Sequence, residues 1–224
     1  MRLAPLKPVL ALALALLTAH AAQAEAPPPT RNFSSFNLRA FAGLVSAPDA
    51  GEAVLDIALD DSAGVEITFK SCAQVQVTPE ARIAESQFAL FRLLTLNCLA
   101  LARWQHSQPA RGSHFPAQLN ARLLAALPAA AVPRLNDEDL ARRAGKTLGA
   151  FEKALRVELR PDGSALARSR GDERVYTVMA RADFDGDGFE DLLLRAQSRA
   201  GRASDLLLVA KTTPTGAIKL IWRP

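Results

Sequence analysis

The chain has 224 residues, of which 49% are apolar, a composition that supports one sizeable core or two small ones. It carries 27 Lys and Arg residues against 23 Asp and Glu residues, and the two signs alternate along the sequence instead of gathering. Because nucleic-acid binding needs a concentrated basic face, this distribution argues against a nucleic-acid partner.

Residues 1–24 have the pattern of an export signal. Arg2 and Lys7 supply the positive start, residues 9–17 are an apolar stretch too short to span a bilayer, and Ala22-Gln23-Ala24 is a small-residue cleavage site. A buried N-terminal helix is the alternative interpretation. We therefore expect a mature chain in the periplasm or outside the cell, without a membrane span.

The mature chain is expected to begin with a proline-rich leader and a β-hairpin. Residues 25–30 contain three consecutive prolines, which favour an extended segment. Over residues 53–70, apolar and polar positions alternate on both sides of a turn at residues 61–64, as in a hairpin. The alternating apolar positions are Leu55, Ile57, Leu59, Val65, Ile67 and Phe69.

A long helix is predicted over residues 79–105, because Thr78-Pro79-Glu80 supplies an N-cap, a proline at the first helical position and an early acid. Between residues 88 and 101 the segment is apolar almost all round, interrupted by Arg92 and Asn97. This pattern indicates the central buried helix of the domain and not a membrane span.

Two shorter helices are predicted after the long one. Phe115-Pro116 marks the start of a helix that ends near Leu127, where the proline-flanked segment 128–133 breaks it. A third helix is expected to begin at a cap formed by residues 136–138.

The only two cysteines, Cys72 and Cys98, are predicted to form a disulfide, since an even count in an exported chain favours pairing. A helix starting at Pro79 would carry Cys98 about 28 Å along its axis. Extended chain from Pro79 back to Cys72 covers roughly 23 Å, so the two sulfurs would approach each other. Two free buried thiols are the alternative. A metal site is disfavoured, because no nearby histidine or cysteine would complete it.

From residue 151 onward the sequence changes to short strands and turns. Neighbouring strands joined by short links usually pair antiparallel, which predicts a meander over residues 151–224. The fold class is therefore α+β, in which the hairpin and about three helices of residues 31–150 pack with this sheet. The predicted strands cover residues 157–160, 165–169, 174–182, 190–197, 205–212 and 217–222.

The strongest chemical signal is the acidic stretch of residues 183–191, which reads DFDGDGFED. Its aspartates fall at loop positions 1, 3, 5 and 9, and Gly188 occupies position 6, where a cation-binding loop turns sharply. Calcium would relieve the repulsion among carboxylates crowded in this way. An EF-hand is excluded, because position 12 is Leu194 and the exit looks like a strand.

Residues 176–210 resemble one FG-GAP or VCBS-type repeat, the strand–loop–strand calcium unit of integrin-α-like propellers. The resemblance implies a calcium site and directs Glu190 to the opposite face of the strand. Propellers repeat the unit and this chain shows one copy, so the single blade is expected to pack on the long helix. A solvated acidic turn and a site for another divalent ion remain alternatives. The implied ligands are Asp183, Asp185, Asp187, Asp191 and the backbone oxygen of Phe189.

The sequence contains no catalytic motif as specific as the acidic stretch. His106 and His114 are the only histidines after the signal, next to Ser107 and Ser113, and neither a nucleophile elbow nor a zinc motif is present. We expect an exported, non-enzymatic protein with structural calcium and a binding or structural role in the cell envelope.

The predicted partner is an envelope or extracellular protein, and the oligomeric state stays open. Two other functions remain. One is a periplasmic inhibitor or immunity-type protein that blocks an envelope enzyme through residues 109–115. The other is a calcium-stabilised hydrolase with unrecognised catalytic residues.

Overall fold

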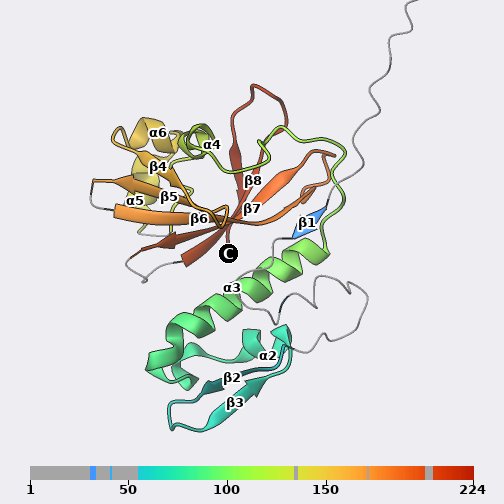
Figure 1. The fold of residues 1–224 in the computed structure, drawn as a ribbon, viewed down its shortest axis with the longest axis vertical. Helices are drawn as coiled ribbons and strands as arrows, with labels where there is room; N and C mark the ends of the chain where they lie inside the picture. The colour runs from blue at the N-terminus through green and yellow to red at the C-terminus, as the bar shows by residue number, and fades with distance from the viewer. Residues whose placement is uncertain (1–30, 34–40, 42–54, 134–135, 171, 200–203) are drawn as a thin grey trace, which may run out of the picture.

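A computed structural model describes residues 31–33, 41, 55–133, 136–170, 172–199 and 204–224. The predicted signal of residues 1–24, the leader of residues 25–30 and the first two residues of the predicted hairpin lie outside the described residues. The described chain is α+β, as the sequence predicts: a central antiparallel sheet lies between a long helix on one side and short helices on the other (Figure 1).

The sheet has seven strands. Six of them follow one another as a meander from β4 to β9, which confirms the predicted order, and β1 pairs with the far end of β6. The strands are β1 (Asn32–Phe33), β4 (Arg156–Leu159), β5 (Ala165–Ser169), β6 (Asp172–Ala182), β7 (Asp191–Ser198), β8 (Ser204–Ala210) and β9 (Lys219–Trp222).

Both faces of the central strands are buried, in two separate apolar clusters. Leu192 and Leu194 of β7 belong to the cluster under the short helices, whereas Leu193 between them belongs to the cluster under the long helix. Successive side chains of a strand point to opposite faces, so a continuous apolar run is what a strand covered on both faces requires.

The long helix α3 (Phe88–Gln105) covers one face and crosses beneath the sheet in Figure 1. Beyond it lies the predicted hairpin, β2 (Ile57–Asp60) and β3 (Glu66–Phe69), followed by a short helix α2 (Cys72–Val77). The rings of Phe69 and Phe91 pack with centroids 5.7 Å apart, so the hairpin and α3 share one core.

The long helix begins at Phe88 and not at the predicted Pro79. Two single 3-10 turns, η2 (Glu80–Arg82) and η3 (Glu85–Gln87), replace its expected first turns. The hairpin competes for this backbone, because Ser62 N–H donates to the Arg82 carbonyl (2.9 Å) and Ala84 N–H to the Asp60 carbonyl (2.8 Å). Long-range pairing therefore overrides the local start signal.

Cys72 and Cys98 form the predicted disulfide, with Cα atoms 5.3 Å apart. The predicted route between them is wrong, since residues 72–77 form α2 and not an extended chain. Ser71 caps this helix by accepting the Gln74 N–H (3.2 Å). The bond thus ties a short helix to the middle of a long one.

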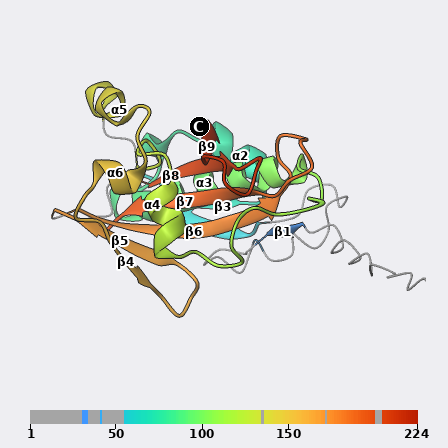
Figure 2. The same ribbon diagram turned by 90° about the horizontal axis from the view of Figure 1, so that it is seen from above.

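Three short helices cover the other face: α4 (Ala121–Ala126), α5 (Asp137–Arg143) and α6 (Leu148–Phe151). The second predicted helix starts at Ala121 and not at Phe115, because Asn120 provides the cap by accepting the Leu123 N–H (2.8 Å). The predicted cap at Asn136 is confirmed, and α6 was not predicted. Figure 2 shows α5 and α6 gathered at one end of the sheet.

Candidate metal site

The acidic loop joins β6 to β7 at one end of the sheet. Gly186 and Gly188 have φ values of +84° and +88°, a conformation that costs little only for glycine. These two residues turn the chain so that three carboxylates converge. Asp183, Asp185 and Asp187 each offer an oxygen within 4.8 Å of the others.

Backbone N–H groups of the loop orient these carboxylates. Asp183 accepts hydrogen bonds from Gly186 (2.6 Å) and Gly188 (2.9 Å), so both of its oxygens face the inside of the turn. Asp185 accepts from Asp187 N–H (3.2 Å), and Asp187 accepts from Phe189 N–H (2.7 Å). The spacing of aspartates and glycines seen in the sequence thus produces a wrapped loop.

Asp191, the fourth predicted carboxylate ligand, lies outside this group of three and is 1% exposed at the start of β7. Its Oδ2 accepts the Phe184 N–H (3.0 Å). Burial raises the pKa of Asp191 to about 7; the bond from Phe184 opposes this shift, and repulsion from the other loop carboxylates adds to it. Its second oxygen accepts no hydrogen bond from any described residue.

Phe189 and Glu190 turn away from the carboxylates. The Phe189 ring packs on His114, with centroids 4.4 Å apart. Glu190 accepts hydrogen bonds from the Ser113 hydroxyl (2.8 Å) and the Arg181 guanidinium (2.8 Å). Glu190 is therefore engaged on the other side of the strand, and only the backbone of Phe189 is available to the loop.

The acidic loop is also hydrogen-bonded to the segment by which the chain passes from one face of the sheet to the other. We call residues 106–112 the crossover, because they follow α3 and lead to the short-helix layer. Gln108 and Asp183 exchange two backbone hydrogen bonds (2.8 and 2.9 Å), Arg111 N–H donates to the Gly188 carbonyl (2.9 Å), and Gly112 accepts from Glu190 N–H (2.8 Å). No local pattern in the sequence indicates these contacts.

These contacts bear on the segment of residues 109–115, which the sequence suggests as a projecting inhibitory loop. Its backbone at Arg111 and Gly112 is bonded to the acidic loop, and Phe115 is buried against the short helices. The segment is therefore a packed connection along much of its length.

The candidate catalytic residues are not brought together. His106 lines a cavity of about 230 Å³ and His114 one of about 340 Å³, and neither cavity is lined by a described serine or acid. Ser107 donates to the Trp104 carbonyl (2.7 Å), and Ser113 donates to Glu190 (2.8 Å).

The donor set of the loop suits a hard cation. Carboxylate oxygens are the ligands that Ca²⁺ and Mg²⁺ prefer, whereas zinc and copper sites draw on histidine and cysteine. The three converging carboxylates could therefore hold a hard divalent cation.

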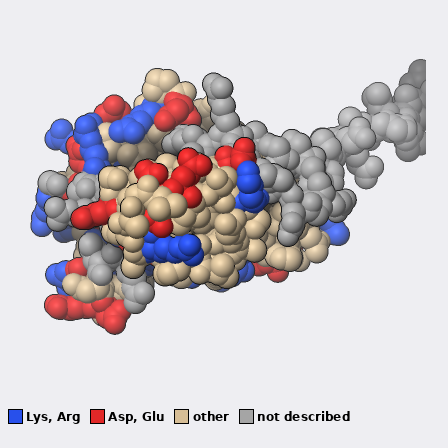
Figure 3. All heavy atoms as spheres, turned by 90° about the horizontal axis from the view of Figure 1, so that it is seen from below, with Lys and Arg blue, Asp and Glu red and all other residues tan. Residues whose placement is uncertain are grey.

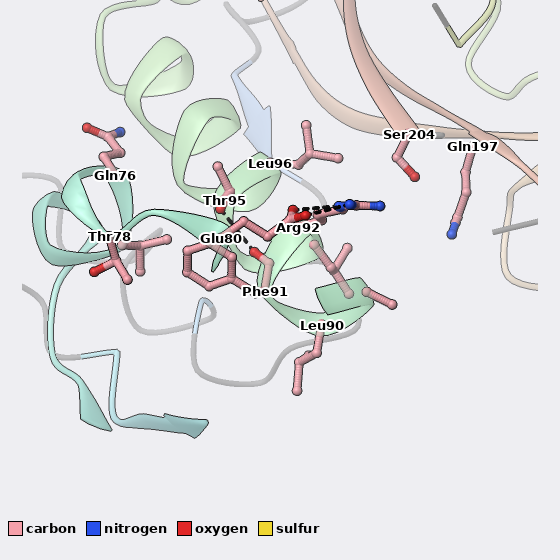
Figure 4. Close-up of a pocket in the computed structure, with 13 residues that line it drawn as sticks. Gln76, Thr78, Glu80, Leu90, Phe91, Arg92, Thr95, Leu96, Gln197 and Ser204 are labelled. Carbon is pink, nitrogen blue, oxygen red and sulfur yellow. Dashed lines mark hydrogen bonds and ion pairs between the residues drawn. The ribbon is translucent and has the colours of Figure 1, made fainter. Parts of the chain in front are cut away.

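A cavity of about 640 Å³ lies elsewhere, between α2, the first turns of α3 and the ends of β7 and β8. Figure 4 shows Glu80 and Arg92 paired on the helix side, with Gln197 and Ser204 across from them. Leu90, which is 37% exposed, adds apolar surface to this groove.

The charged side chains of the described residues do not form one basic patch on the face shown in Figure 3. Acidic groups gather across its middle, and basic groups lie at separate points around them.

Comparison of the chain with protein-family models, curated proteins and solved structures finds no match. Within the residues that the structure describes, no helix has the length and apolar character needed to cross a membrane.

Proposed function

We propose that this chain is an exported, non-enzymatic protein that holds one structural calcium ion in the loop of residues 183–191. Asp183, Asp185 and Asp187 would bind the ion, joined by Asp191 and the backbone oxygen of Phe189. The observation that supports this proposal most is the convergence of three carboxylates within 4.8 Å on a loop whose backbone wraps around them.

A structural role follows from what surrounds the loop. Its carboxylates repel one another, and a divalent cation would replace this repulsion by attraction. The backbone of the same loop carries the crossover, so an ion here would stiffen the point where the two layers of the protein are joined. Sites of this kind outside cells usually bind calcium with affinities of about 10⁻⁴ to 10⁻³ M.

The test is calcium-dependent stability. At a calcium concentration about a hundred times Kd, the free energy of unfolding should rise by about 2.7 kcal/mol. Replacing Asp185 and Asp187 together by alanine should remove this gain. Asp162→Ala is a matched control, because Asp162 is also an exposed aspartate in a glycine-containing turn. An equal calcium response in the double variant would contradict the assignment of the ligands.

Support for a binding role in the envelope comes from the groove beside α2 and α3. It is open, mixed in polarity and lined by the exposed Leu90. A photo-crosslinking residue at position 90 should capture an envelope or extracellular protein in the native compartment. The same residue at Leu159, an exposed apolar position on β4, is the control. Identical products from both positions would argue against the groove.

A further inference from the structure

Arg195 is a buried cation without a partner in the part of the chain that the structure describes. It lies in β7 between two residues of the short-helix cluster, so its side chain points to the α3 side of the sheet. Its residue surface is 6% exposed, and its Nη1 is enclosed with no acceptor. No described hydrogen bond or ion pair includes Arg195, and burial alone lowers its pKa.

Several other arginines that are buried or partly buried are paired with an acid, unlike Arg195. Arg143 and Arg174 both contact Glu152, and Arg181 contacts Glu190. A buried guanidinium without an anion costs free energy, which is why such groups are normally paired. The structure therefore contains a preformed cationic position whose anion does not come from the described chain.

Arg195 lines a cavity of about 460 Å³ at a gap in the edge of β6. β5 pairs with β6 only as far as Tyr176, and β1 pairs with the same edge of β6 only at Ala180 and Arg181. The open stretch between them, with the β4–β5 turn and residues 117–119, forms the walls of this cavity.

The walls of the cavity favour an anion. Arg160 and Arg181 join Arg195 there, and Asn32, Gln118 and Gln197 offer amide donors. One acid, Asp162, also lines the cavity and accepts the N–H (2.9 Å) and hydroxyl (2.6 Å) of Ser164. Glu190 does not line the cavity and is bound by Arg181. Positive charge is therefore left over.

We propose that this cavity binds the carboxylate or phosphate group of a small polar molecule, with Arg195 as its principal contact. The planar guanidinium matches both groups with two parallel hydrogen bonds. The volume is within the range of small-molecule sites and larger than a bare ion needs. The site contains none of the proposed calcium ligands and does not depend on calcium; Arg181 connects it to the acidic loop through Glu190.

The experiment uses the purified chain in calcium-free buffer at constant ionic strength. Inorganic phosphate and succinate are titrated separately, with melting temperature and heat of binding as readouts. We expect a saturable rise in melting temperature with at least one of them, and the stronger response identifies the phosphate or the carboxylate as the group bound. Failure of both anions to give a saturable response would overturn the proposal without bearing on the metal loop.

Two variants separate binding from packing. Arg195→Met keeps the length of the side chain; it should melt higher than the native chain without added anion and bind the anion at least about tenfold more weakly. Arg199→Met removes an equal charge from an exposed position of the same region and should bind like the native chain. Unchanged affinity in a folded Arg195→Met variant would refute the assignment.

If Arg195→Met does not fold, Arg195→Lys provides the decision. Lysine keeps the charge and lacks the planar fork, so it should weaken binding while the response to ionic strength persists. Affinity equal to that of the native chain would show that Arg195 is not the contact.

Discussion

The two faces of the sheet are joined to their helices by different chemistry. On the α3 face, aromatic and aliphatic side chains form the contact, and one disulfide ties α2 to α3. On the short-helix face, Glu152 lies buried between Arg143 and Arg174, and the Tyr176 hydroxyl donates to the Ala131 carbonyl (2.8 Å).

The difference follows from helix length. α3 has 18 residues and presents a continuous apolar surface to the sheet. α4, α5 and α6 have 6, 7 and 4 residues. Helices this short are not stable alone, so directed polar contacts add to the apolar cluster that holds their layer in place. The two layers should therefore respond differently to substitution.

Removing Glu152 should have the largest effect. Glu152→Ala leaves Arg143 and Arg174 buried without their shared carboxylate, which should cost about 3 to 5 kcal/mol of unfolding free energy. Urea denaturation measures this change. The control is Glu158→Ala, since Glu158 pairs with Arg168 on the surface and its loss should cost less than about 1 kcal/mol. Equal losses would show that the buried ion pairs of Glu152 stabilise the short-helix layer no more than a surface pair does.

Removing the disulfide on the α3 face should cause the next largest loss of unfolding free energy. Replacing Cys72 and Cys98 by serine frees a loop of the unfolded chain and should cost about 3 kcal/mol. Reducing agent should destabilise the native protein by a similar amount and leave the double variant unchanged. Alkylation before reduction should find no free thiol. A native protein indifferent to reductant would show that packing alone holds α2 to α3.

The sequence predicts those helices and strands whose position is set by a local pattern of residues. The strands follow from alternating or continuous apolar runs between turns with positive-φ glycines, such as Gly163 and Gly186. The start of α3 could not be predicted, because the backbone of Arg82 is bonded to Ser62, a pairing distant in sequence. Local capping at Pro79 is a weaker signal than that pairing.

The same limit applies to the sites. The three converging aspartates lie within five consecutive residues, so the sequence alone indicates them. The crossover contacts of Gln108 and Arg111 join distant segments and leave no local trace. Arg195 is visible as a charge within an apolar strand, but only the structure shows that it is buried without a partner.

Asp191, at the end of the sheet where the two layers meet, should make the unfolding free energy depend on pH. The raised pKa of Asp191, about 7, means that the folded state holds a proton that the unfolded state has released. This contribution is complete below the ordinary pKa of an aspartate and is lost as pH rises toward 7. Without calcium, the unfolding free energy should therefore fall by about 2 kcal/mol between about pH 5 and pH 6.5.

Two comparisons sharpen this measurement. Asp191→Asn should flatten the fall of unfolding free energy with pH. The control is Asp162→Asn: hydrogen bonds from Ser164 lower the pKa of the exposed Asp162, so its removal should leave the fall unchanged. Saturating calcium should also flatten it, because the ion competes with the proton for the Asp191 carboxylate. A decrease that survives in Asp191→Asn would assign it to another group.

The smallest predicted effect concerns Asn97, a polar defect in the apolar layer of α3. Its side chain is fully buried, and neither its amide nitrogen nor its carbonyl oxygen has a hydrogen-bond partner among the described residues. Asn97→Leu keeps the number and branching of the side-chain heavy atoms and should raise the unfolding free energy by about 1 kcal/mol, because no desolvated polar group remains. Thr95→Val on the same helix is the control; its hydroxyl donates to the Phe91 carbonyl (3.0 Å), so its loss should not stabilise. A destabilised Asn97→Leu would mean that the amide has a partner beyond the described residues, and the α3 layer would then also depend on a directed polar contact.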